Sequence, residues 1–469
     1  MRRLTIFPLL ALAGCSMNPH LERPALPVAP AYPQTRATDA PKAEDLGWQA
    51  MLGDPQLRAL IALALDDNRD LRIAVMEAQA ARAQFRVTDA ARLPQLSAQG
   101  SYTRQRIPSS VAGAGVGLSD GVGASGFEYG QWNGQVALSA FELDLFGRLK
   151  SQSQAAFERY LATAEGARAS RITVITTVAN AWLARQLAAE QEELTRSTLA
   201  DWHQSLDLTR RLRDAGQSSG LEVAQAEGLV RQAEADLQQR EREIAQANNA
   251  LTLAVGHSLP GDPPAPARLM QQPIVTRLDA GLPSSLLERR PDIVQAEHTL
   301  RAANADVGAA RAAFFPRLTL TGAFGGSSLA LDTLFTGASR NWSFAPALTV
   351  PIFQGGQLRG SLRLADVRKS QAVAAYEKAI QSAFRDVADG LAAQATYGAQ
   401  MAAQLQSVST ADRRAELSRL RYTAGVDSRL ELLDAQRSAY SAQQTLLALR
   451  KDQLAAAIAL YGALGGGLK

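Results

Sequence analysis

Long stretches of this chain repeat apolar residues at the spacing of an α-helix. After Asp54 and Pro55, a cap followed by a proline, apolar side chains recur every three or four positions through residue 65. A second periodic stretch runs from about residue 67 to 92, and residues 149–214 keep the period without a proline. At 1.5 Å per residue the last stretch would be roughly 100 Å long. The sequence therefore predicts a protein built mainly from long helices.

Between these helical stretches the period of the apolar residues changes to two. Leu96, Ala98 and Gly100 alternate with serine and glutamine, which predicts a strand with one polar face. Further strands are predicted over residues 132–146, 317–324 and 342–353. The connecting loops, rich in Gly and Ser, are predicted over residues 106–131 and 325–341.

The order helix, strand, loop, strand, helix occurs twice. Pro94 and Pro316, which precede the first strand of each copy, lie 222 residues apart, and Gly216 and Gly425 lie 209 residues apart. A nearly constant offset of this kind indicates an internal duplication. In each copy the two shorter helices together match the long one, so we expect them to meet end to end beside it.

A thirteen-residue stretch after each long helix is identical at six positions; the two copies are residues 215–227 and 424–436. Gly216 and Gly425 fall where the long helix should end, and Ser219 and Ser428 fall where a side chain would cap the next helix. Each stretch is predicted to form the tip of a helical hairpin, with its glycine in the left-handed conformation.

The four strands are about ten residues long and are flanked by aromatic residues, as transmembrane β-strands are. The flanking aromatic residues are Tyr102, Trp132, Phe141, Phe324, Trp342 and Phe353. Four strands cannot close a barrel, so the barrel would be shared: two subunits give eight strands and three give twelve. Polar residues favour a water-filled duct; they are Ser97, Gln99, Ser101, Asn133, Gln135 and Ser139. The alternative is a pair of soluble β-hairpins that cap a helical bundle.

Composition and charge limit the other functions. The chain has 469 residues, of which 46% are hydrophobic and 6% aromatic, and a net charge of +4. Without residues 1–14, which contain two arginines and no acid, the charge is 4 − 2 = +2, so nucleic acid is not an expected partner. No run of eighteen apolar residues follows the N-terminus, so no transmembrane helix is predicted. The histidines lack metal-ligand spacing; they are His20, His203, His257 and His298.

The N-terminus resembles a bacterial lipoprotein signal. Arg2 and Arg3 precede an apolar core at residues 4–12, and the small-residue site that follows ends at Cys15, the single cysteine. The resemblance implies that Cys15 carries a covalent lipid, a diacylglycerol and an N-acyl group, which would anchor it firmly. Ser16 in place of an aspartate favours the outer membrane. The prolines of residues 18–45 predict an extended tether.

Several motifs resemble the TolC-type outer membrane efflux proteins over about residues 48–465. They stand at residues 142–148, 282–283, 286–287, 289–293, 296–297, 314–316, 351–353, 422, 424–425 and 433–436. With the lipoprotein signal, the glycine-rich ending at residues 461–467 resembles the NodT-type subgroup that serves RND efflux pumps.

The resemblance implies a mostly α-helical fold with a small β part. Duplicated helical hairpins and four transmembrane strands would assemble as a homotrimer, with a 12-stranded β-barrel continued by a 12-helix α-barrel across the periplasm. The expected segments are a signal peptide (1–14), a lipidated tether (15–45), a first repeat (46–260), an equatorial linker (261–285) and a second repeat (286–469). The implied partners are a periplasmic adaptor and an inner-membrane RND pump.

In this interpretation the protein is a passive outer membrane duct that exports drugs or other small molecules from the periplasm. The adaptor would contact the tips; the predicted contact residues are Gly216, Leu221, Glu222, Gly425, Leu430 and Glu431. The duct should close just before a tip, where Asp412 and Glu416 share a helix face, with Arg413 and Arg419 close by. The resembling channels carry an aspartate near the position of Asp412.

Two motifs typical of enzymes lack the context that their chemistry needs. Residues 216–220 fit the G-x-S-x-G nucleophile pattern, but a helix precedes them instead of a strand. Residues 121–126 fit G-x-G-x-x-G, but a strand follows them instead of a helix. No enzymatic activity or other cofactor is therefore expected. The functional alternatives are a structural envelope lipoprotein and the outer membrane exit duct of another export system.

Overall fold

The computed structural model describes residues 16–22, 24–32, 40–43, 45–108, 127–259, 266–281 and 290–468. Cys15, the signal segment and residues 121–126 lie outside them. The described chain divides into two compact units. The first unit contains Ala80–Tyr160, His298–Val373 and the described residues up to position 22. The second contains the described residues of Pro24–Gln79, Leu161–Glu297 and Ala374–Lys469.

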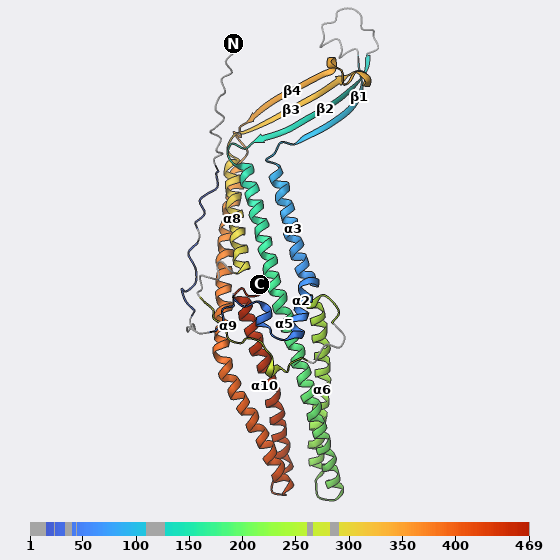
Figure 1. The fold of residues 1–469 in the computed structure, drawn as a ribbon, viewed down its shortest axis with the longest axis vertical. Helices are drawn as coiled ribbons and strands as arrows, with labels where there is room; N and C mark the ends of the chain where they lie inside the picture. Colours follow the sequence, from blue (N-terminus) through green and yellow to red (C-terminus); the bar gives the residue numbers. More distant parts are fainter. Residues whose placement is uncertain are drawn as a thin grey trace, which may run out of the picture. The chain divides into compact units, whose positions relative to one another are not determined.

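Helices make up most of the described chain (Figure 1). The α-helices are α1 (Trp48–Met51), α2 (Pro55–Asp67), α3 (Arg69–Ala90), α5 (Arg148–Asp214), α6 (Gly220–Val255), α8 (Pro291–Ala312), α9 (Gln357–Thr423) and α10 (Arg429–Ala463). Short 3-10 helices are η1 (Leu269–Gln271), η3 (Leu331–Thr333) and η4 (Gly337–Ser339). Two helices, α5 and α9, have 67 residues each, which confirms the predicted long helices. Asp54 caps α2 through its side chain and Pro55 is the first helical residue, also as predicted.

The strands form one antiparallel sheet in the order β1-β2-β3-β4. Their bounds are Leu96–Ile107, Phe127–Leu143, Arg317–Ser328 and Arg340–Thr349. The predicted loop bounds were therefore wrong at both connections. The second strand begins five residues earlier than expected and ends three residues earlier, and η3 and η4 occupy much of the predicted loop 325–341. Alternation could not locate these ends, because glycine and serine suit strands and loops alike.

The shorter helices meet end to end within the second unit, as the duplication predicted. The side-chain amide of Asn68, just before α3, donates to the carbonyl oxygen of Ala254 near the end of α6, at 2.7 Å. Just before α8, the guanidinium of Arg290 donates to the carbonyl oxygen of Ala463 at the end of α10, at 3.1 Å. Each contact satisfies a carbonyl that the last helical turn leaves without a partner. The two copies thus satisfy the equivalent helix end with different side chains, an asparagine in the first and an arginine in the second.

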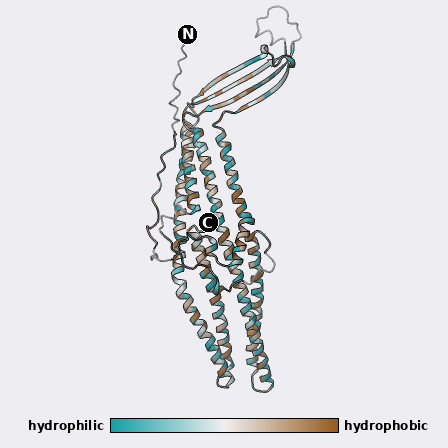
Figure 2. Ribbon diagram, viewed as in Figure 1, coloured by the Kyte–Doolittle hydropathy of each residue, from teal (hydrophilic) through white to brown (hydrophobic). Residues whose placement is uncertain are grey.

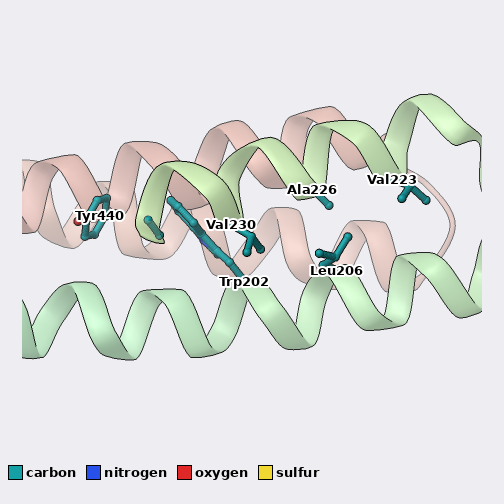
Figure 3. Close-up of a cluster of buried hydrophobic side chains, with 7 residues drawn as sticks. Trp202, Leu206, Val223, Ala226, Val230 and Tyr440 are labelled. Atoms are coloured by element: carbon teal, nitrogen blue, oxygen red, sulfur yellow. The ribbon is translucent and has the colours of Figure 1, made fainter. Parts of the chain in front are cut away.

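A cluster of buried side chains packs the two hairpins of the second unit together on the way to their tips. The buried cluster there consists of Trp202 and Leu206 on α5, Val223, Ala226, Val230 and Ala233 on α6, and Tyr440 on α10 (Figure 3). The Tyr440 hydroxyl also forms a 2.8 Å hydrogen bond with Thr195 of α5. Elsewhere hydrophilic and hydrophobic residues are interspersed along the helices (Figure 2). One cluster therefore joins the first hairpin to the second.

The N-terminal segment contacts the folded units. Asn18 accepts a hydrogen bond from the Ser151 hydroxyl of α5 at 2.7 Å and donates to Gln154 at 2.9 Å. Asn304 of α8 donates to the carbonyl oxygen of Pro19. In the second unit the ring of Tyr32 stacks on Phe384 at 4.9 Å. The segment predicted to be an extended tether is thus held at several points.

Two buried tyrosines should make the fold sensitive to alkali. Burial raises the pKa of Tyr32 and of Tyr461 to about 12. The Tyr461 hydroxyl donates to the carbonyl oxygen of Leu46 at 2.8 Å, which a phenolate cannot do.

Unfolded tyrosine ionises near pH 10. The stabilisation from neutral Tyr32 and Tyr461 is therefore complete below pH 10 and is lost as the pH rises through 12. We expect the thermal midpoint of the helical circular dichroism to fall between pH 10 and 12, and to fall less steeply in Tyr461→Phe. Equal slopes for the two proteins would contradict this account.

Candidate functional site

The turn after each long helix has the backbone geometry that the repeated sequence predicts. Gly216 has φ +75° and Gly425 has φ +70°. In the first turn the amide of Gln217 donates to the carbonyl of Leu212 at 2.7 Å, and that of Gly216 donates to Arg213 at 2.8 Å. The second turn forms the equivalent pair of bonds. These are the two bonds of a Schellman helix end, so the left-handed glycines are confirmed.

Serine caps start the helix after each turn, but the two caps differ. Ser219 accepts from the amide of Glu222 at 3.2 Å, and the Glu222 carboxylate accepts from the amide of Ser219 at 3.0 Å, which completes a capping box. Ser428 accepts from the amide of Glu431 at 3.4 Å, but the Glu431 carboxylate is engaged by Arg414 of α9 instead. The second turn therefore uses its glutamate to join the two helices of its hairpin.

A network of charged side chains links α9 and α10 near the second turn. Arg414 lies 2.7 Å from Glu431 and 2.9 Å from Asp434, and Asp434 also lies 2.9 Å from Arg437. The hydrogen bonds that Arg414 donates, first to Glu431 and then to Asp434, raise the pKa of Arg414. All of these side chains are substantially exposed, so water and salt screen each pair and its contribution to stability is small. Sequence reasoning missed Asp434, although it lies three residues after Glu431 on the same helical face.

The predicted gate residues lie on α9 but do not form one cluster within the chain. The Asp412 carboxylate accepts a hydrogen bond from Gln443 of α10 at 2.8 Å. Glu416 pairs with Arg419 at 2.8 Å, and this hydrogen bond lowers the pKa of Glu416. Arg413 lines a groove of about 640 Å³ together with Arg414 and other residues of the second turn. Asp412 therefore has an amide partner within its own chain.

One buried arginine joins the second turn to the first hairpin. Arg429, the first residue of α10, is 2% exposed and donates to the carbonyl oxygen of Ser205 on α5 at 3.0 Å. Its guanidinium also lies over the ring of Tyr422, 4.9 Å from the ring centre. The equivalent residue of the first turn is Gly220, around which a Cβ would meet nothing within 4 Å. The two copies of the repeat already differ at this position in the sequence. Only the packing of the hairpins shows that the arginine joins them.

The predicted contact residues at the tips fall into two groups. Leu221 is 68% exposed and Leu430 is 59% exposed, so both apolar side chains project from the start of their helices. Glu222 and Glu431 are used within the chain, in the cap and in the ion pair with Arg414. An incoming protein would therefore meet leucine side chains at both turns.

The sheet has one apolar and one polar face. On the polar face, Gln99 lies opposite Gln135 and Ser101 opposite Asn133. On the other face, Tyr102 lies opposite Trp132, and the cross-strand pairs that continue it are Val136 with Phe324, Phe324 with Trp342, and Leu318 with Leu348. The predicted polar face is confirmed over this register. Such a sheet suits a boundary between water and an apolar medium.

A bulge in β2 changes the face of the residues that follow it. The pairing with β3 shifts between Leu138 and Phe141, and Ala140 in the bulge has φ +44°. Strict alternation would place Phe141 on the polar face with Asn133. The shift instead puts Phe141 opposite Leu320 on the apolar face. The sequence at these positions does not predict the bulge, because the bulge contains no glycine.

The serine of the nucleophile-like pattern lies at a helix cap, and the described residues hold no metal-binding cluster. Ser218, the serine of the nucleophile-like pattern, donates its hydroxyl to Glu222, a residue of the helix cap. Among the described residues no group of three or more histidine, cysteine or acidic side chains is placed to hold a metal ion. None of the described helices combines the length and apolar character needed to cross a membrane.

The tip geometry can be tested with two glycines that both have open space at Cβ. Gly216→Ala should cost roughly 1–2 kcal/mol, because φ +75° is unfavourable for a residue with a Cβ. Gly220→Ala is the matched control, since Gly220 is helical and meets nothing within 4 Å. We expect faster amide hydrogen exchange at residues 212–222 in Gly216→Ala alone. Equal exchange in the two variants would show that the turn does not depend on its left-handed residue.

Comparison with known proteins identifies relatives of the whole chain. The family model described as outer membrane efflux protein matches residues 60–257 and 282–466. The outer membrane protein OprJ of Pseudomonas aeruginosa is 44% identical over 464 residues, which cover 98% of this chain and 94% of OprJ. The toluene efflux pump outer membrane protein TtgF of Pseudomonas putida is 43% identical over 475 residues, covering 99% and 96% of the two chains.

Solved structures agree over nearly the full length. The crystal structure of a membrane protein from Pseudomonas aeruginosa has a TM-score of 0.88 at 42% identity, covering 96% of this chain and 100% of that one. The open state of the MtrE outer membrane channel of Neisseria gonorrhoeae has a TM-score of 0.88 at 37% identity, covering 97% and 99%. Similarity at this level extends through both copies of the duplicated unit.

Proposed function

This chain belongs to the outer membrane efflux protein family, and we propose that it forms the passive outer membrane channel of a tripartite RND-type efflux system. It is an outer membrane protein, as its relatives are. The family is one of channels and not of enzymes, and we assign no catalytic residue to this chain. The proposed cargo is drugs or other small molecules that leave the periplasm.

The two-faced sheet is the observation that carries this proposal. Its strands have 12, 17, 12 and 10 residues, enough to cross the apolar core of a bilayer. The apolar face, with Trp132, Phe324 and Trp342, suits contact with lipid. The polar face, with Gln99, Asn133 and Gln135, suits a water-filled lumen. A scaffold protein would have no need for a polar face that lines a lumen.

The need to pair the two outer strands of the sheet supports a homotrimer. The outer strands β1 and β4 have no further neighbour in the described chain, and unpaired backbone groups in lipid cost several kcal/mol each. Three copies would provide twelve strands and, from the long helices and the paired shorter helices, a continuous helical barrel. In keeping with missing subunits, α3 has no buried residue although Ile73, Met76 and Val87 lie on it.

The hairpin tips are the proposed docking site for a periplasmic adaptor, which would connect the channel to an inner-membrane pump. Two observations support this: both turns lie at the same end of the second unit (Figure 1), and each presents an exposed leucine, Leu221 or Leu430. Gly216 and Gly425, also proposed as contact residues, would shape the docking site through their left-handed turns. In this proposal the channel is passive and the pump supplies the energy.

The closed state would be held by weak charged contacts just before the second tip. The residues first predicted for it are Asp412, Arg413, Glu416 and Arg419, and the network of Arg414 with Glu431 and Asp434 adds a second set. Repeated by threefold symmetry, these side chains would form rings around the lumen. Exposed ion pairs are easily separated, which suits a closure that docking must open.

Single-channel conductance tests both the duct and its closure. Asp412→Ala and Asp434→Ala should each raise the conductance of the isolated protein in planar bilayers, and high salt should partly reproduce the effect by screening. Asp366→Ala is the matched control, because Asp366 is an exposed aspartate of the same helix about 70 Å away at 1.5 Å per residue. Conductance indistinguishable from wild type in the first two variants would refute this gate, and no conductance at all would refute the duct.

Lipidation of Cys15 is the proposed covalent modification, a diacylglycerol and an N-acyl group that anchor the chain. Cys15→Ser should abolish incorporation of labelled palmitate, while the strands still direct insertion. Labelling should be measured on the purified protein, with Asn18→Ala as a control that changes the contact to Ser151 but keeps the cysteine. Undiminished labelling of Cys15→Ser would show that the lipid is not attached there.

A further inference from the structure

Three glycines lie side by side across the apolar face of the sheet. Gly100 of β1 pairs with Gly134 of β2, which pairs with Gly326 of β3. The connection between β3 and β4 lies over one end of this row. A Cβ at Gly134 would come within 3.3 Å of the Leu334 side chain, and one at Gly326 within 2.2 Å of the Leu334 carbonyl oxygen. A Cβ at Gly100 would meet nothing within 4 Å, so the row stays open at β1.

The open part of the row is a groove of about 750 Å³, here called the glycine groove. Its apolar walls are Ala98, Tyr102, Trp132, Val136, Phe324, Leu331, Leu334 and Phe335. The rings of Tyr102 and Trp132 lie 4.5 Å apart, and Phe335 is 87% exposed at the edge. The volume is within the range of ligand-binding sites, and aromatic walls of this kind are unfavourable in water.

One charged side chain lines the groove among the described residues. Arg340 begins β4 directly opposite Gly326, and no described carboxylate pairs with its guanidinium. No acidic residue lines the groove within the described part of the chain. The groove therefore combines an apolar trough with one positive charge at its end, which is the pattern that an anionic amphiphile complements.

We propose that the glycine groove binds an acyl chain of an anionic lipid of the surrounding membrane, with the phosphate of the headgroup beside Arg340. The proposal rests on the proposed function, because the apolar face must lie in the bilayer. A peptide segment would fit less well. The backbone groups of β2 and β3 are paired on both sides within the sheet, and the free side of β1 would pair with another subunit in the proposed trimer, so an inserted peptide would leave its own amides without partners in lipid. An acyl chain has no such groups.

The shape of the groove can be tested by filling it. The trimer would be equilibrated with vesicles of equal parts phosphatidylglycerol and phosphatidylcholine, extracted in detergent, and its retained lipid counted by native mass spectrometry. Gly100→Leu should retain about tenfold less phosphatidylglycerol than wild type, since its side chain would occupy the open end of the row. Gly322→Leu is the matched control: it lies on the same face, opposite Leu138 and Phe344, where a Cβ makes an ordinary 3.5 Å contact.

The charge can be tested separately. Arg340→Gln should keep a retained lipid but lose the preference for phosphatidylglycerol, whereas Arg317→Gln, at the other end of the β3–β4 pair, should keep it. Equal retention by Gly100→Leu and Gly322→Leu, or no lipid preference in the wild type, would overturn the site. Such a result with normal channel conductance would overturn the groove alone. A protein that gives no conductance would overturn the proposed function and, with it, the placement of this face in lipid.

Discussion

The unpaired edges of the sheet are the constraint on which the rest of the structure depends. Hydrogen bonds pair β1 with β2, β2 with β3 and β3 with β4, and leave one side of β1 and of β4 open. In water such edges are a hazard, and in lipid they are prohibitive. In the proposed channel, the missing strands would come from other subunits. The exposed apolar residues of α3 raise the same requirement among the helices.

The tested parts of the fold could be predicted where one local rule decided the outcome. Helical period, prolines and caps located α2 and α5, and the repeated glycines gave the left-handed turns with φ +75° and +70°. Where two rules competed, the prediction failed. The strand ends were misplaced in stretches of glycine and serine, and the bulge at Ala140, which was not predicted, gives Phe141 the face opposite to that of strict alternation. A bulge depends on cross-strand geometry, which no single strand's sequence contains.

The tips show why the site was harder to predict than the fold. Duplication gives both turns the same backbone, but the side chains at equivalent positions have diverged. Arg429 crosses to Ser205 of the first hairpin, whereas a Cβ at its counterpart Gly220 would meet nothing within 4 Å. Glu222 completes its own cap, whereas Glu431 is drawn away to Arg414. The charge pattern placed a gate at Asp412 and Glu416, but the partner of each arginine depends on which helices lie alongside each other.

The strengths of these contacts suggest how the second unit would move if the duct opens. The buried cluster around Trp202 and Tyr440, together with the buried Arg429, joins the two hairpins of one chain. Breaking the cluster would expose apolar surface, and breaking the contact of Arg429 would leave a buried charge without a partner. The pairs of Arg414, Glu416 and Arg419 are exposed and individually weak. In the proposed channel, a displacement that keeps the buried contacts would move the two hairpin tips of each chain together, while the exposed pairs of α9 and α10 remain free to exchange partners. Opening would then take place mainly between subunits.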